Sequence, residues 1–179
     1  SPLMSETPTG ACCSIIADPS RVDAVRTISD ANPDPREDLD TLARLTAFAF
    51  KAPICVISLV SDTRVRFVGK FGLDACEVAL DESLCTQVIC RDGPVEVLNL
   101  STDPELCDHP VAVGPPFVRA YCGQPLLSPE GLNIGAVAVV DTAPFFRFTD
   151  EDREALKAAT ETARRLLFGN RLQSAQSEA

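Results

Sequence analysis

The chain of 179 residues is poor in positive charge, with 16 Lys and Arg against 26 Asp and Glu and a formal net charge of -10. Nucleic-acid binding gains much of its affinity from counterions that Lys and Arg displace, and anionic lipid attracts the same side chains. We therefore expect neither nucleic acid nor a membrane as a direct partner. The apolar runs at 54–60 and 134–141 are also far shorter than the roughly 20 residues that cross a bilayer.

Histidine and phosphate-binding glycine motifs are scarce as well, and this excludes several kinds of enzyme. A Ser-His-Asp catalytic set would have a single histidine to draw on, His109. Gly69, Gly72 and Gly123 do not have the spacing of the glycine-rich loops that bind nucleotide phosphates. We expect neither a triad hydrolase nor a P-loop or dinucleotide enzyme.

Eight cysteines are present, but no two of them have the CxxC spacing of metal-binding pairs. Several fall in patterns typical of core strands or helices, and Cys55 within ICVISLV is the clearest example. Cysteine behaves as a small hydrophobe in such cores. We interpret these residues as buried, reduced thiols of a cytoplasmic protein, with no metal site among them.

The length suits one domain, which can bury roughly 70% of its unfolded surface around a single core. Residues 1–17 show neither a hydrophobic period nor strong charge, so we expect a flexible N-terminal arm in which Cys12 and Cys13 are exposed. Residues 18–170 should form the domain, and residues 171–179 a flexible C-terminal tail.

The first half of the domain predicts two helices followed by a hairpin. Asp18-Pro19 and Asp34-Pro35 each place an acidic N-cap before a proline, which is a helix-start pattern. The run at 54–60 is typical of a strand buried on both faces. The next strand alternates, and one of its faces should carry Val65, Phe67, Gly69 and Phe71.

The second half predicts a long crossing segment, a second hairpin and a closing helix. Its elements are, in order, a helix at 81–92, a strand at 95–98, strands at about 117–127 and 132–141, and a helix capped by Thr149. Because helices do not alternate one-for-one with strands, we expect an α+β fold with an antiparallel sheet rather than a doubly wound parallel one.

Residues 103–120 combine rigid and aromatic side chains. Pro110, Pro115 and Pro116 leave the backbone little entropy to lose, and Phe117 adds aromatic surface. Such a segment is typical of a lid that covers a pocket beside a sheet.

Several short motifs resemble the GAF domain family and keep its order over about residues 20–168. They are Pro53-Ile54 through Val60, Arg66-Phe67-Val68, Ser83-Leu84-Cys85, Gly114-Pro115-Pro116, Gln124-Pro125-Leu126 and Ile134-Gly135 through Thr142. The resemblance implies a five- or six-stranded antiparallel sheet, with the terminal helices on one face and a loop or short-helix lid over a pocket on the other. It also implies a regulatory sensor domain that binds a small molecule, forms a homodimer through its terminal helices, and signals to an output domain or signalling protein.

The chain lacks the motifs of two ligand-specific groups of this family. Bilin-binding domains are expected to have a Cys-His dipeptide, and cyclic-nucleotide-binding domains an Asn-Lys-Phe-Asp-Glu pattern, and neither occurs. The sequence therefore identifies neither the ligand nor a cofactor.

The expected ligand-binding residues come from the strands and the crossing segment. They are Phe67, Phe71, Cys85, Val88, Cys107, His109, Phe117, Arg119 and Tyr121. The aromatic side chains either line a pocket or fill it themselves, and a filled pocket would leave a plain dimerisation domain. Arg66 or Arg119 could pair with an anionic group of a ligand.

Three cysteines keep a redox alternative open beside the main expectation of a non-enzymatic domain. Cys85 should lie near the start of a helix, whose dipole favours a thiolate, but it can also pack as part of the core. Cys107-Asp108 is similar to the catalytic stretch of the free methionine-R-sulfoxide reductases, which are GAF-fold enzymes. Cys85 would then be the resolving thiol, and Cys122 could pair with either on oxidation.

Overall fold

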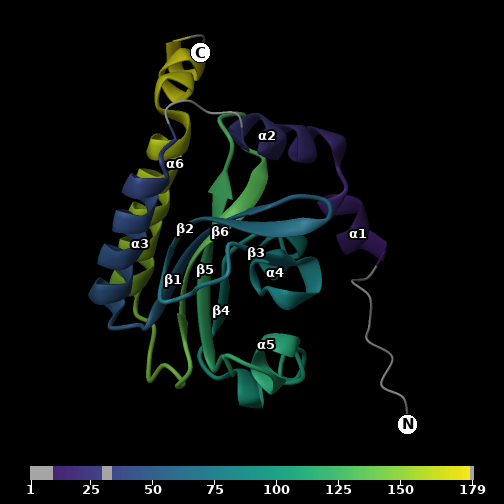
Figure 1. The fold of residues 1–179 in the computed structure, drawn as a ribbon, viewed down its shortest axis with the longest axis vertical. Coiled ribbons are helices and arrows are strands. Elements are labelled where there is room, and N and C mark those ends of the chain that lie inside the picture. The colour runs from purple at the N-terminus through teal and green to yellow at the C-terminus, as the bar shows by residue number, and fades with distance from the viewer. Residues whose placement is uncertain (1–9, 30–33, 178–179) are drawn as a thin grey trace.

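A six-stranded antiparallel sheet forms the centre of the molecule, in the order β3-β2-β1-β6-β5-β4 (Figure 1). The computed structural model describes residues 10–29 and 34–177. The strands are β1 (Ile54–Val60), β2 (Arg64–Phe71), β3 (Glu77–Ala79), β4 (Val95–Val97), β5 (Ala120–Leu127) and β6 (Asn133–Asp141). Neighbouring strands all pair antiparallel, so the predicted fold class is confirmed.

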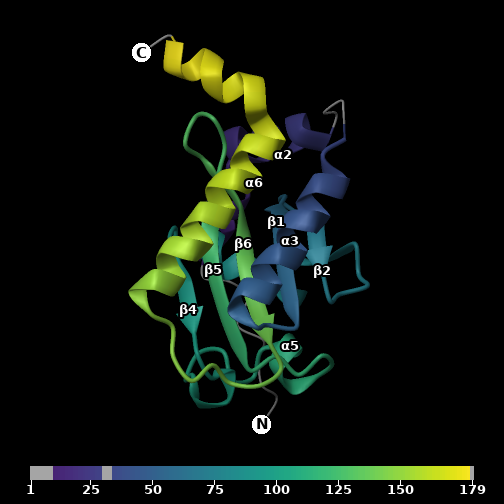
Figure 2. The same ribbon diagram turned by 90° about the vertical axis from the view of Figure 1, so that its left-hand side faces the viewer.

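Helices cover both faces of this sheet. On one face, α3 (Arg36–Phe50) and α6 (Asp150–Ser177) run side by side (Figure 2), and Val25 and Ile28 of α2 (Pro19–Ser29) join the core beneath them. The other face carries the elements α1 (Gly10–Ile16), η1 (Leu80–Glu82), α4 (Cys85–Cys90), η2 (Leu100–Thr102) and α5 (Pro110–Val113). Within the described residues, no helix is both long enough and apolar enough to cross a bilayer.

The central strands are buried on both sides because each face of the sheet has its own core. All seven residues of β1 are buried. Ile54 and Val56 pack in the core that faces α4, whereas Cys55 and Ile57 pack in the core beneath α3 and α6. This alternation explains why the sequence of β1 is apolar without interruption.

A β-bulge in β2 changes which residues share a face. Ser58 of β1 pairs with Phe67 but the preceding Ile57 pairs with Gly69, so β2 has one extra residue at Val68. The prediction that Phe67, Gly69 and Phe71 lie on one face is therefore wrong. Beyond the bulge the backbone of Gly69 lies so close to α3 that an added Cβ would be 2.8 Å from Leu39 Cβ.

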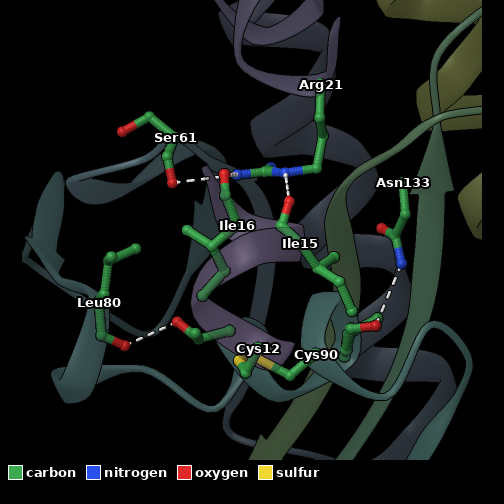
Figure 3. The surroundings of a disulfide bond; sticks show 10 residues. Cys12, Ile15, Ile16, Arg21, Ser61, Leu80, Cys90 and Asn133 are labelled. Carbon is green, nitrogen blue, oxygen red and sulfur yellow. Dashed lines mark hydrogen bonds between the residues drawn. A yellow bond between two sulfur atoms is a disulfide. The ribbon is translucent and has the colours of Figure 1, made fainter. Parts of the chain in front are cut away.

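The N-terminal segment is folded from Gly10, where the sequence predicts a flexible arm. Gly10–Ile16 form α1, which packs against α4. Cys12 is buried and forms a disulfide with Cys90 (Figure 3), so the interpretation of these two residues as reduced thiols is wrong. Residues 1–9 and the side chain of Cys13 lie outside the described part of the chain.

Arg21 joins this N-terminal segment to the sheet (Figure 3). Its side chain is 3% exposed, and its guanidinium donates hydrogen bonds to the backbone carbonyls of Ile15, Ile16, Val60 and Ser61. Burial lowers the pKa of Arg21, and the nearby Asp18 and Asp62 act in the opposite direction. The carbonyls supply the negative ends of dipoles that a buried guanidinium needs.

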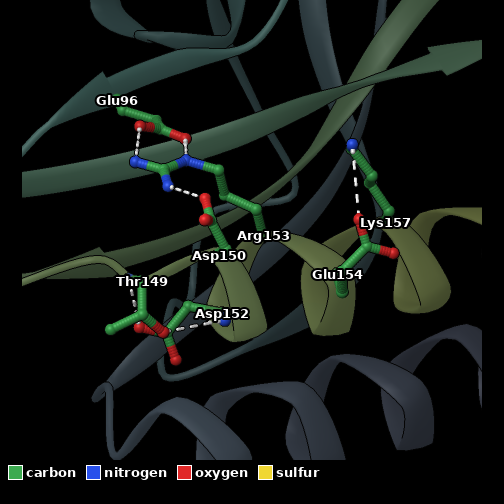
Figure 4. A network of polar contacts seen from close by, with 7 residues as sticks. All are labelled: Glu96, Thr149, Asp150, Asp152, Arg153, Glu154 and Lys157. Atoms are coloured by element: carbon green, nitrogen blue, oxygen red, sulfur yellow. Dashed lines mark hydrogen bonds and ion pairs between the residues drawn. The ribbon is translucent and has the colours of Figure 1, made fainter.

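The last helix begins as predicted and is tied to the edge of the sheet. Thr149 Oγ1 accepts a hydrogen bond from Asp152 N at 3.2 Å, and Asp152 Oδ2 accepts one from Thr149 N at 2.8 Å. Next to this cap, Arg153 donates to both carboxylate oxygens of Glu96 on β4, at 2.6 and 3.0 Å (Figure 4). The helix passes a non-helical Gly169 and continues to Ser177, where a tail was expected.

Candidate ligand-binding pocket

A cavity of about 380 Å³ lies between the sheet and the crossing segment. Its floor consists of side chains from four strands: Ile54, Val56, Phe67, Tyr121 and Val140. These residues alternate with residues that belong to the opposite core, so the pleat of each strand directs them toward the cavity. The volume falls within the range of small-molecule sites, which is roughly 300–1,000 Å³.

The predicted lid covers this floor. Residues of α5 and of the loop after it line the cavity: Pro110, Val111, Pro115, Pro116 and Val118. The segment is closed by its own hydrogen bonds, in which Val118 N donates to Val111 O and Phe117 N donates to Gly114 O, both at 2.8 Å. These hydrogen bonds help to fix its shape, and Ala112 and Val118 also pack in the core that contains the floor.

The third wall comes from the segment before α4, together with Leu73, Ala75 and Val78 at the rim. Glu82, Ser83, Leu84 and Cys85 line the cavity here. A helix starting at Asp81 was expected, but a 3₁₀ turn ends at Glu82 and α4 begins at Cys85 itself. Ser83 Oγ accepts a hydrogen bond from Cys85 N at 3.1 Å and so satisfies a free N–H at the start of α4.

Tyr121 and Cys85 meet at the base of the pocket. Tyr121 Oη donates to Cys85 Sγ at 3.2 Å, and the two residues are 2% and 1% exposed. Burial, followed by the nearby Cys85, raises the pKa of Tyr121 well above its ordinary value. The phenol therefore stays protonated, and its O–H donates to Cys85 Sγ. Gly123 makes room for the ring, because a Cβ there would be 2.8 Å from Tyr121 Oη.

Three of the nine expected site residues line the cavity: Phe67, Cys85 and Tyr121. Val88 is fully buried in the same core but does not line the cavity. Phe71 lies on the other face of the sheet because of the bulge, and its ring makes an edge contact with Phe48 at 5.3 Å between centroids.

The other four expected residues belong to the lid segment but point elsewhere. Cys107 is exposed, and Phe117 is 48% exposed on a left-handed backbone with φ 61°. Arg119 donates to the carbonyls of Ala112 and Val118, so it holds the lid and does not line the cavity.

His109 acts as the N-cap of α5. Its Nδ1 accepts a hydrogen bond from Val111 N at 3.2 Å. Burial lowers the pKa of His109, although the charges of Asp81 and Asp108 act in the opposite direction. A neutral imidazole suits this position, because the capping nitrogen must be free of a proton.

The structure separates Cys122 from Cys85, two of the cysteines of the redox alternative. Cys122 belongs to the core beneath α6, on the opposite side of the sheet from Cys85, so a disulfide between these two is excluded. Burial raises the pKa of both Cys55 and Cys122 to about 12, which keeps them as thiols at neutral pH. In the described part of the chain, no three His, Cys, Asp or Glu side chains gather in a way that could hold a metal.

Sequence reasoning missed most of the floor. Ile54, Val56 and Val140 lie in strands that are apolar on both faces, so their pattern does not indicate which face borders a cavity. The prolines of the lid were expected to cover a pocket, and Pro110, Pro115 and Pro116 do line it.

Comparisons with known proteins agree with this architecture. A cyclic di-GMP phosphodiesterase of Pseudomonas aeruginosa is 36% identical over 105 residues, which are 59% of this chain but 18% of that protein, so the chain spans about a fifth of its length. The GAF domain of an Acinetobacter phosphoenolpyruvate-protein phosphotransferase superposes with a TM-score of 0.60 at 18% identity, covering 83% of this chain and 92% of that one.

An enzyme has the same fold. The free methionine-R-sulfoxide reductase of Neisseria meningitidis superposes with a TM-score of 0.60 at 18% identity, and 89% of each chain is covered. The model of the GAF domain matches residues 34–166, which include the whole sheet, the lid, all of α3 and part of α6. The chain therefore belongs to the GAF domain family.

Proposed function

We propose that this chain is a regulatory sensor domain that binds a small molecule in the cavity beneath the lid. The observation that carries the proposal is the cavity itself, which is mainly apolar and has a few converging polar groups at Ser83, Cys85 and Tyr121. An open cavity argues against the alternative that aromatic side chains fill it, because Phe67 and Tyr121 are the only aromatic residues that line it in the described part of the chain. The similarity of its fold to sensor domains, such as part of a methyl-accepting chemotaxis protein, supports the same function.

The signal would leave the domain through α6. Two connections support this route. β5 packs against α6, and the Glu96–Arg153 ion pair joins β4 to the first turn of α6 (Figure 4). A ligand shifts such a helix only by its difference in affinity for the two arrangements, which is typically about 1–3 kcal/mol.

The test combines a pocket-filling variant with hydrogen exchange. Val56 lines the floor, so Val56→Phe extends a ring into the cavity, whereas Val113→Phe is the control because Val113 is 62% exposed and does not line the cavity. Native mass spectrometry of the purified protein should detect a retained molecule in wild type and in Val113→Phe, and not in Val56→Phe. Hydrogen exchange in α6 should differ between protein with this molecule and protein stripped of it. Unchanged exchange at saturation would contradict signalling through α6.

Homodimerisation through the terminal helices stays a prediction. It is supported by apolar side chains on α3, beside α6, where Leu45 and Phe48 are 60% and 61% exposed. Light scattering at high concentration should give a dimer for wild type and a monomer for Leu45→Glu. Val113→Glu, a matched substitution at an exposed residue of the lid, should leave the dimer intact.

A further inference from the structure

We propose that the cavity selects a mainly apolar amine and rejects anionic ligands such as nucleotides and carboxylates. The proposal rests on the small-molecule binding proposed above and adds the chemical class of the ligand. It follows from the charges and hydrogen-bonding groups that face the cavity, and from those that are near the cavity but already engaged.

No basic side chain is available to an anion in this cavity. None of the described residues that line it is Lys, Arg or His. Lys70 is near the rim, but its Nζ donates to the carbonyls of Asp74 and Ala75 at 2.6 and 3.2 Å. Arg119 is held by carbonyls of the lid, and burial lowers the pKa of His109 and keeps it neutral. A carboxylate or phosphate placed here would lose its water without gaining a cation.

The groups that do face the cavity offer acceptors. Glu82 contributes a carboxylate, which has no ion-pair partner in the described part of the chain and accepts one long hydrogen bond, at 3.4 Å from Ala79 N. Tyr121 uses its only proton on Cys85, so its oxygen offers lone pairs to a ligand. A protonated amine supplies the donors and the positive charge that these groups lack.

Further acidic side chains lie near Glu82 and the lid. Asp81 stands next to Glu82 at the edge of the cavity, and α5 lies against η1. The negative charges of Asp81 and Asp108 both act on His109, the N-cap of α5 in the lid. These carboxylates, together with Glu82, favour the approach of a cation over that of an anion.

The rest of the cavity suits an apolar body. Its walls are aliphatic or proline side chains on all three sides, and Phe67 and Tyr121 add two aromatic rings to the floor. Aromatic faces also attract cations, so they favour an ammonium group over a carboxylate.

Three indoles that share one ring system test the preference for charge: tryptamine is a cation, indole is neutral and indole-3-acetate is an anion. The protein contains no Trp, so the fluorescence of the bound indole can be followed directly. Glu82 is exposed and solvent screens its charge, so tryptamine should bind severalfold more tightly than indole-3-acetate.

Two variants of equal charge locate the effect. Both carboxylates are exposed: Glu82→Gln removes the one that lines the cavity, and Glu130→Gln removes one in the turn between β5 and β6. Glu82→Gln should abolish most of the preference for tryptamine, and Glu130→Gln should leave it unchanged. Val56→Phe should weaken the binding of all three indoles.

The outcomes separate this proposal from the proposed function. Indole-3-acetate binding as tightly as tryptamine, equal effects of Glu82→Gln and Glu130→Gln, or no binding of any indole would each overturn the amine preference. If native mass spectrometry nevertheless finds a retained anion that Val56→Phe loses, the domain still senses a small molecule, and the inferred class is wrong. If neither a retained molecule nor an indole depends on Val56, both proposals fail.

Discussion

Reduction of the Cys12–Cys90 disulfide should lower the stability of the domain substantially. The two residues are separated by 78 positions, so the bond closes a long loop in the unfolded chain. For a loop of this length, the chain-entropy relation gives about 4.5 kcal/mol at 25 °C. Measured values for disulfides are usually smaller, and we expect a loss of about 2–4 kcal/mol.

Other contacts of α1 keep the expected loss below the upper value. Ile16 and Cys12 remain buried in the core that faces α4, and the four carbonyl bonds of Arg21 still hold the end of α1. The reduced protein should therefore fold, with a looser α1. Urea unfolding with and without dithiothreitol measures the difference.

The control is Cys90→Ala, which cannot form the bond. Its unfolding curve should not respond to dithiothreitol, and it should resemble that of the reduced wild type. Alkylation followed by mass spectrometry should show two more modified cysteines in wild type after reduction than before. If those two cysteines appear but the urea curves coincide, the reasoning from loop closure is refuted.

Three further predictions concern single side chains. Arg21→Met leaves buried carbonyls without a donor and should cost roughly 2–4 kcal/mol in urea unfolding, whereas a loss within error would contradict its role as an anchor. Because burial lowers the pKa of folded His109, its contribution to stability is present above the unfolded-state value of about 6.5 and is lost as the pH falls toward the lower folded-state value. His109→Asn keeps a capping acceptor and should lose less stability on acidification than wild type, as measured by thermal unfolding at several pH values; parallel curves would argue against burial of the imidazole. In native protein, iodoacetamide should modify the exposed Cys76 and Cys107 and spare Cys55 and Cys122, whose pKa values burial raises to about 12; peptide mapping that found Cys55 modified early would contradict that burial.

The sheet could be predicted from the sequence because its strands have strong patterns. The run at 54–60 and the turn at Ser128 to Gly131 define strands whose bounds the structure confirms closely. By contrast, α1 has no capping signal, and a residue 78 positions away fixes it through Cys12. The bulge at Val68 is invisible for a similar reason, since it becomes apparent only when β2 is aligned with β1.

The pocket was predictable in outline but not in detail. Prolines stiffen a segment whatever it packs against, so Pro115 and Pro116 were sufficient to predict a rigid lid. The direction of a side chain in the lid depends on turns that have no sequence period, and for this reason the sequence did not show that Phe117 and Arg119 would not line the cavity. Glu82 was missed because an acidic residue in a short turn usually indicates only an exposed surface, and Glu82 is both exposed and part of the cavity lining.

Two neighbouring residues of β5 point to opposite faces of the sheet. Tyr121 faces the cavity, and Cys122 packs in the core beneath α6. Only the backbone of β5 therefore separates the proposed ligand-binding cavity from the core beneath α6. A small shift of β5 moves Tyr121 and Cys122 together, so the proposed coupling between the cavity and α6 needs no hinge between domains. Substitutions at either residue should therefore change both ligand binding and the position of α6.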